Sequence, residues 1–274
     1  MKKLLFLSVV ALLAACQSEP SMPMCHDPNT AFAMFASDKS FRDAHPAPLP
    51  VALTNAGKNI EFSVKDGAKG RGYLVKAAHR TNKYLLLFHE WWGLNDYVRN
   101  EAAMWSKELD INVLAVDLYD GKVTSNPDEA GKLMQSCARE RALAIIDGAA
   151  KYAGRKADFR TMGWCFGGGW SLQGALQLKD KVKACVMFYG MPEKDVEKLK
   201  SLAPDVLMVH AKNDKWINDE VVAEFKKNMK AAGKSLTVNE YNADHAFANP
   251  SSPKYNEQAA REARTAVKAY LSGK

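Results

Sequence analysis

The sequence lacks the features of several common protein classes. Its longest apolar run, residues 4–13, is too short to cross a bilayer as a stable helix. It has no internal repeat, no zinc-ligand spacing and no dinucleotide-binding fingerprint, so we predict neither a metal nor an organic cofactor. Basic and acidic residues are interleaved, and the formal net charge is only +7. Nucleic-acid binding is therefore not expected, and no feature identifies a protein partner.

Cysteine is scarce. The five cysteines are Cys16, Cys25, Cys137, Cys165 and Cys185. Two of them have roles suggested below and the other three show no obvious pairing, so no disulfide framework is predicted. Hydrophobic residues, in contrast, make up 47% of the 274 residues, which is enough for the core of one large α/β domain.

The N-terminus has the layout of a secretory signal over residues 1–15. Lys2 and Lys3 precede the apolar run, and small residues follow it. The end of this segment, Leu-Ala-Ala-Cys at residues 13–16, resembles a bacterial lipobox, which implies cleavage before Cys16 and a lipid on that cysteine. An ordinary cleaved signal is the alternative. We expect an exported lipoprotein of the cell envelope that touches the membrane only through its lipid anchor.

Residues 16–50 contain many prolines and are interpreted as a tether and lead-in that packs in part on the domain. The short apolar stretch of residues 31–35 could equally form a small helix. Residues 51–274 are predicted to form the folded domain.

Short strand patterns alternate with helical patterns through this domain. The expected strands are residues 60–64, 72–76, 84–88, 111–116, 158–164, 182–189, 205–210 and 236–241. The expected helices are residues 97–109, 127–150, 168–178, 219–233 and 255–271. Asp66 and Gly67 between the first two strands are typical of a hairpin turn. The alternation predicts an α/β fold with a mostly parallel central sheet of about eight strands and helices on both faces.

The stretch that carries chemistry is Gly-Trp-Cys-Phe-Gly at residues 163–167, between a predicted strand and a predicted helix. This is the pattern of a nucleophile elbow with cysteine in place of serine. Gly163 and Gly167 leave room for the strained turn, and the helix N-terminus favours the thiolate of Cys165. Cys165 is therefore the predicted nucleophile. A buried structural cysteine, or a loose dinucleotide-type loop, is the alternative.

Two further polar residues follow in the chain order of α/β-hydrolases, which is nucleophile, acid and histidine. Asp214 comes after the strand of residues 205–210, and His245 after the strand of residues 236–241. We expect His245 to take the thiol proton and Asp214 to fix the tautomer of the ring and stabilise the imidazolium.

The oxyanion hole is expected from two backbone N–H groups, those of Phe166 and Trp91. Each such donor contributes ~3–4 kcal/mol in comparable sites. Two residues compete with the predicted triad. Asp244 is badly placed to reach the ring because it is adjacent to His245, and His89 precedes the nucleophile and is expected to pack within its loop.

From about residue 59 to the C-terminus, the chain resembles the dienelactone hydrolase family, a cysteine branch of the α/β-hydrolase fold. The matching segments are residues 89–95, 163–169, 213–214 and 244–247. The resemblance implies Cys165 as nucleophile, His245 as base and Asp214 as orienting acid. It also implies that Glu90 holds the resting thiol and releases it when substrate binds.

The chain departs from the family where a substrate carboxylate would bind. Members that open dienelactones use two arginines, one shortly after the catalytic histidine and one near the start of the helix before the elbow. Here Asn249 stands at the first position, and residues 125–130 contain no arginine. Arg99, Arg139 and Arg141 are the candidates to replace them. Dienelactone itself is therefore not expected as the substrate.

The sequence thus predicts a hydrolase of dienelactone hydrolase type that cleaves ester, lactone or thioester bonds of small molecules through a covalent thioacyl-enzyme. A non-catalytic ligand-binding lipoprotein on the same fold is one alternative, favoured by the missing arginines and the oxidisable thiol. An acyl-transfer or thiol-based redox protein is another.

Overall fold

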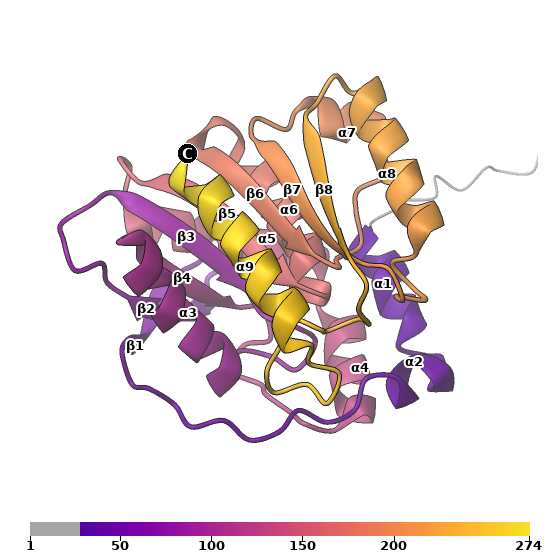
Figure 1. Cartoon of the computed structure of the whole chain (residues 1–274). Coiled ribbons are helices and arrows are strands. Elements are labelled where there is room, and N and C mark those ends of the chain that lie inside the picture. The colour runs from indigo at the N-terminus through magenta and orange to yellow at the C-terminus, as the bar shows by residue number, and fades with distance from the viewer. Residues whose placement is uncertain (1–27) are drawn as a thin grey trace, which may run out of the picture.

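A computed structural model of the chain describes residues 28–274 (Figure 1). The predicted signal peptide of residues 1–15, the expected lipidation site Cys16, and Cys25 lie outside the described residues. Within residues 28–274, no helix has both the length and the apolar character needed to cross a membrane.

An eight-stranded sheet forms the centre of the domain, in the order β1-β2-β4-β3-β5-β6-β7-β8. The strands are β1 (Lys58–Ser63), β2 (Lys69–Val75), β3 (Lys83–Phe88), β4 (Asn112–Asp117), β5 (Asp158–Trp164), β6 (Val182–Phe188), β7 (Asp205–Ala211) and β8 (Leu236–Tyr241). Strand β2 runs antiparallel to β1 and β4, and the remaining pairs of the sheet are parallel. The predicted mostly parallel sheet of about eight strands is confirmed.

Helices cover both faces of this sheet. The helices are α1 (Pro28–Phe35), α2 (Lys39–Asp43), α3 (Asp96–Leu109), α4 (Pro127–Ser136), α5 (Arg139–Ala153), α6 (Phe166–Leu178), α7 (Val196–Lys200), α8 (Asp219–Ala231) and α9 (Glu257–Ser272). Helices α3 and α9 contact each other in front of the sheet, whereas α5 and α6 contact each other behind it (Figure 1). The central strand β3 is covered from both sides, and Leu85, Leu86, Leu87 and Phe88 are fully buried.

The single helix expected over residues 127–150 is wrong. Cys137 and Ala138 have extended backbone, with ψ of 92° and 130°, and they separate α4 from α5. Helix α4 packs on α1, while α5 packs on α6 and on strands of the sheet. One straight helix could not make both sets of contacts. Gly148 lies within α5, and the close packing on β1 explains why this helical position is a glycine. A Cβ atom there would lie 2.8 Å from the backbone oxygen of Ser63.

The lead-in packs closely on the domain. Residues 31–35 belong to helix α1, which contacts α4 and α6, and α2 contacts α4. The side chains of Phe32 and Phe41 are buried with 1% and 0% exposure. Burial of each of these two side chains stabilises the packing of the lead-in on the domain by about 1.5–3 kcal/mol. The two short helices therefore lie over the end of the sheet where β5 meets α6.

Candidate active site

Cys165 lies in the turn between β5 and α6, with a left-handed backbone at φ 55°. Such a conformation is strained for a residue with a side chain. Two features hold it: the Cys165 N–H donates to the carbonyl oxygen of Phe188 at 3.0 Å, and α6 begins immediately afterwards. A side chain on Gly163 would collide with the backbone of Gly167, and one on Gly167 would collide with the backbone of Phe88. The turn has the geometry of a nucleophile elbow.

Two loops bring the other predicted residues to this turn. Asp214 follows β7 and His245 follows β8. The Nδ1–H of His245 donates to Oδ2 of Asp214 at 2.5 Å. The other oxygen of Asp214 accepts the N–H groups of Trp216 at 2.9 Å and Ile217 at 3.0 Å. These bonds fix the orientation of the imidazole and leave its Nε2 for the thiol.

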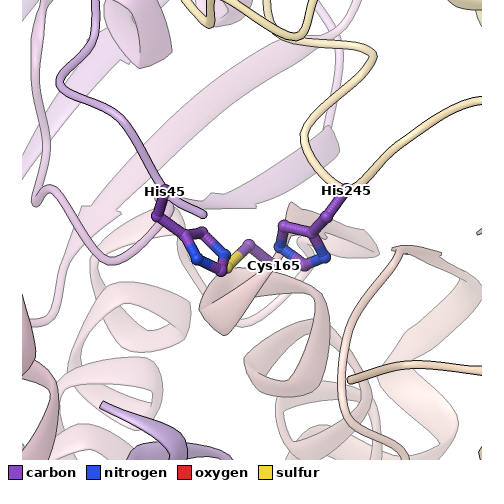
Figure 2. A group of neighbouring side chains, drawn as sticks. All are labelled: His45, Cys165 and His245. Carbon is purple, nitrogen blue, oxygen red and sulfur yellow. The ribbon is translucent and has the colours of Figure 1, made fainter. Parts of the chain in front are cut away.

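Three buried side chains that can bind a metal meet at the elbow: Cys165, His245 and His45. The sulfur and one ring nitrogen of each histidine all lie within 4.8 Å of one another, and Figure 2 shows the two rings on either side of the sulfur. Neither Nε2 atom has a hydrogen-bond partner among the described residues. The structure therefore groups Cys165, His245 and Asp214, as the sequence predicts, and adds His45.

Burial and charge set the protonation of this group. Burial raises the pKa of the Cys165 thiol, against the attraction of the nearby His245. Burial disfavours the charged form of His245, but the charges of Asp214 and of the thiolate outweigh it and raise the pKa of the ring well above its ordinary value. The Asp214 carboxyl is also buried, yet His245 lowers its pKa. Asp214 is thus ionised, and one proton is shared within the Cys165–His245 pair.

Glu90 lies beside this pair and is buried. Its Oε2 accepts a hydrogen bond from Nδ2 of Asn249 at 2.6 Å, and its Oε1 has no partner among the described residues. Burial raises the pKa of Glu90 to about 7, although the bond from Asn249 opposes the shift. When ionised, Glu90 raises the pKa of the Cys165 thiol. The thiol-holding role implied for Glu90 remains a prediction. Asn249, which stands where the family pattern has an arginine, donates a hydrogen bond to this carboxyl.

Of the two expected oxyanion donors, the Phe166 amide lies at the elbow. The Phe166 N–H lies in the first turn of α6, where backbone amides have no hydrogen-bond partner within the helix. The hydrogen bond of this amide to the sulfur lowers the pKa of Cys165. Trp91 is buried in the loop after β3, with its ring 5.4 Å from that of Phe41. The roles of both amides toward an oxyanion remain predictions.

The two rivals of the triad have other surroundings. His89 donates from Nδ1 to the carbonyl oxygen of Glu90 at 2.6 Å and accepts the N–H of Leu118 at its Nε2 at 3.1 Å, so both ring nitrogens are occupied. Asp244 is exposed. His89 therefore joins the ends of β3 and β4 and has no free nitrogen for a proton transfer.

The candidate arginines bind elsewhere on the domain. Arg99 binds the carboxylate of Asp96, Arg139 binds the amide oxygen of Gln173, and Arg141 binds the carboxylates of Asp66 and Asp120. None of these contacts directs a guanidinium toward Cys165.

The lead-in closes the site. Phe32 stacks on the ring of His245 at 6.4 Å between centroids, and Phe41 packs edge-on against Trp216 at 5.0 Å. Cys165 and His245 are each only 2% exposed as a result. In this arrangement the lead-in shields the sulfur of Cys165 from solvent.

His45 is the site residue that the sequence did not reveal. Its Nδ1–H donates to the carbonyl oxygen of Phe41 at 2.6 Å, and its ring lies 4.8 Å from that of His245. Burial, with the charge of His245, lowers the pKa of His45 to about 3, so the ring is neutral. No periodic pattern marks a histidine in a proline-rich segment. The only available signal was an aromatic residue, Phe41, one helical turn before it.

Comparison with known proteins gives the family. A sequence model of the Dienelactone hydrolase family matches residues 71–273. Protein usf of Aquifex pyrophilus is 30% identical over 210 residues, covering 70% of this chain and 87% of its own. The carboxymethylenebutenolidase of a Pseudomonas species is 23% identical over 218 residues, covering 75% of this chain and 91% of its own.

Solved structures give the same fold. A candidate dienelactone hydrolase from Klebsiella pneumoniae has a TM-score of 0.69 and 22% identity, covering 80% of this chain and 99% of that one. The chain therefore belongs to the dienelactone hydrolase family and is a hydrolase of the ester and lactone type. The family match begins at residue 71, so the lead-in with His45 precedes it.

We expect Glu90→Gln to gain stability relative to the wild type as the pH rises. The pKa of Glu90 is about 7 in the folded chain, against the ordinary value of 4.5 that applies in the unfolded chain. The neutral acid therefore contributes its full stability below pH 4.5, and this contribution is lost as the pH rises through 7, because the unfolded chain ionises first. The free energy of urea unfolding of the variant, minus that of the wild type, should grow by about 2–3 kcal/mol between pH 5 and pH 8. Glu61→Gln, at an exposed position, is the control. A constant difference across this range would rule out a buried neutral Glu90.

We expect Phe41→Ala to expose the thiol. Loss of a buried phenylalanine costs about 3–5 kcal/mol, and part of that loss weakens the packing of α2 on the domain. The rate of alkylation of Cys165 by iodoacetamide, followed by peptide mass, should rise about tenfold or more. Leu49→Ala, which changes an exposed residue of the same lead-in, should leave the rate unchanged. Equal rates in Phe41→Ala and wild type would show that the lead-in does not shield the sulfur.

Proposed function

We propose that the chain hydrolyses carboxylic esters, lactones or thioesters of small molecules through nucleophilic attack by Cys165. The observation that best supports this is the hydrogen bond from His245 to Asp214 beside a cysteine held at a strained elbow. A ring fixed in this way has an Nε2 without a hydrogen-bond partner among the described residues, and one of its nitrogens lies within 4.8 Å of the sulfur. This is the arrangement that activates a thiol by an adjacent base.

In the first half of the reaction, Nε2 of His245 takes the thiol proton and Sγ of Cys165 bonds to the acyl carbon. Asp214 stabilises the imidazolium that forms. The tetrahedral intermediate then expels the alcohol or thiol, which receives the proton from His245. A thioacyl group remains on Cys165.

In the second half, His245 takes a proton from water, and the resulting hydroxide adds to the thioester carbon. The thiolate of Cys165 leaves and regains the proton, and the carboxylic acid is released. For a lactone, the alcohol and the acid belong to one product, a hydroxy acid. The N–H groups of Phe166 and Trp91 are the proposed donors to the oxyanion in both halves, worth ~3–4 kcal/mol each.

The surroundings of the site favour an apolar acyl group. Trp91, Trp216 and Phe41 pack around His45 and His245. Arg99, Arg139 and Arg141 are bound elsewhere, so no guanidinium among them is available for a substrate carboxylate. The name of the Pseudomonas relative, a carboxymethylenebutenolidase, supports lactones as one substrate class. We propose that neutral esters and lactones react faster than carboxylate-bearing ones.

Glu90 has a proposed role in restraining the thiol at rest. Its carboxyl lies beside the catalytic pair and is held by Asn249. As a carboxylate it disfavours the thiolate of Cys165, so a substrate that changes its protonation or position would release the nucleophile.

A burst experiment tests the nucleophile. The reduced full chain is mixed with a panel of activated aryl esters and small lactones, and the released product and intact mass are followed. We expect one equivalent of rapid product and an acyl adduct on Cys165, and a loss of both in Cys165→Ala. Cys137→Ala, which changes a cysteine between α4 and α5, is the control and should keep both the burst and the adduct. Full turnover by Cys165→Ala would refute the mechanism, and no burst with no adduct in reduced wild type would favour a ligand-binding lipoprotein.

We also propose that the chain is exported and anchored by a lipid on Cys16, as the layout of residues 1–16 suggests. Expressed in a bacterium, the wild type should sediment with membranes, and Cys16→Ala should appear in the soluble fraction. Cys25→Ala is the matched control and should stay with membranes. A wild type that is fully soluble would refute the anchor.

A further inference from the structure

The lead-in and the elbow together form a cluster of three metal-ligating atoms. Sγ of Cys165 and one ring nitrogen each of His45 and His245 lie within 4.8 Å of one another (Figure 2). Nε2 is the nitrogen available in both rings, because each Nδ1 makes a hydrogen bond. The three residues are buried, with exposures of 2%, 6% and 2% respectively. One thiolate and two neutral imidazoles are ligands that zinc binds well. We propose that Cys165, His45 and His245 bind one thiophilic divalent cation of the zinc class.

The second nitrogen of each histidine supports this assignment. His45 donates its Nδ1–H to the carbonyl oxygen of Phe41 at 2.6 Å, and His245 donates its Nδ1–H to Asp214 at 2.5 Å. Metal-ligating histidines make this type of bond, because it fixes the tautomer and directs the lone pair of Nε2 to the metal. These bonds fix the tautomer of both rings and leave each Nε2 with a lone pair for an ion.

The Nε2 of His45 has no hydrogen-bond partner among the described residues. It is a buried acceptor without a donor, and such an unsatisfied group costs about 1–3 kcal/mol. The ring of His45 packs against the aromatic rings of Phe41, Trp91 and Trp216. A side chain that served only to fill this space would cost less as a phenylalanine. A bound cation accounts for the lone pair.

The dimensions and charges suit a tetrahedral ion. Bonds of about 2.3 Å to sulfur and about 2.0–2.1 Å to nitrogen place the ligand atoms roughly 3.3–3.6 Å apart. Since these atoms lie within 4.8 Å of one another, the most distant pair must approach by at most about 1.2–1.5 Å. Rotation of the His45 side chain, just after the short helix α2, can supply this approach. The thiolate of Cys165 and the carboxylate of Asp214 balance the two positive charges, and the proton of the Cys165–His245 pair leaves to solvent. A water completes the fourth position.

The metal would compete with catalysis. It occupies the sulfur lone pair that attacks the substrate and the nitrogen that accepts the proton. This consequence, unlike the site itself, rests on the proposed function. We expect stoichiometric ZnCl2 to suppress the burst of the wild type, and a chelator to restore it.

The test measures binding directly. The reduced, chelator-treated full chain is titrated with CoCl2, and the near-ultraviolet thiolate-to-cobalt absorption is recorded. We expect one Co2+ per chain in the wild type, loss of the absorption in Cys165→Ser, and affinity at least about tenfold lower in His45→Gln. His79→Gln, on the exposed surface, is the matched control and should bind as the wild type does.

X-ray absorption of the zinc-loaded wild type provides a readout that needs no variant. The expected coordination is one sulfur and two imidazole nitrogens. Two or more sulfurs, no stoichiometric binding, or unchanged affinity in His45→Gln would overturn the proposal. An acyl adduct on Cys165 without metal binding would remove this site and leave the proposed hydrolysis intact. Metal binding by these three residues without an acyl adduct on Cys165 would support the metal site and contradict the proposed hydrolysis.

Discussion

The left-handed backbone of Cys165 is the constraint on which the rest of the site depends. The turn is possible because Gly163 and Gly167 have no side chains, so β5 and α6 can approach each other closely. The parallel sheet then brings the ends of β7 and β8, with Asp214 and His245, to the same edge. The arrangement of the site therefore follows from a steric condition at one turn and from the direction of the strands.

Closure of the site by the lead-in changes the chemistry as well as the access. Because Phe32, Phe41 and His45 exclude water, burial raises the pKa of Cys165 and of Glu90. Low polarity also strengthens the interaction of His245 with Asp214. The closed site therefore holds its proton within one buried pair, and the burial of the thiol depends on the position of α1 and α2.

Much of this arrangement could be predicted from local sequence patterns. The bounds expected for β5 and β8 agree with the structure, because both strands have strong patterns and clear ends. The elbow is a local motif, and the order of Cys165, Asp214 and His245 in the chain is enough to place them at one sheet edge. Their positions are as expected, while their chemical roles remain predictions.

Features that depend on distant contacts could not be predicted. The break between α4 and α5 arises from the packing of α4 on α1, a contact that no local pattern encodes. His45 reaches the site because the lead-in folds back over the elbow, and its proline-rich context indicated only a tether. The bond from Asn249 to Glu90 likewise joins residues 159 positions apart.

The most direct test of the account is a crystal structure of the chain after reaction with a slowly deacylating aryl carbamate. The account predicts a carbamoyl group bonded to Sγ of Cys165, with its oxygen between the N–H groups of Phe166 and Trp91 and with the lead-in displaced from the sulfur. A carbamoyl group on any other residue, or an unmodified Cys165 in protein that has turned over the carbamate, would contradict it.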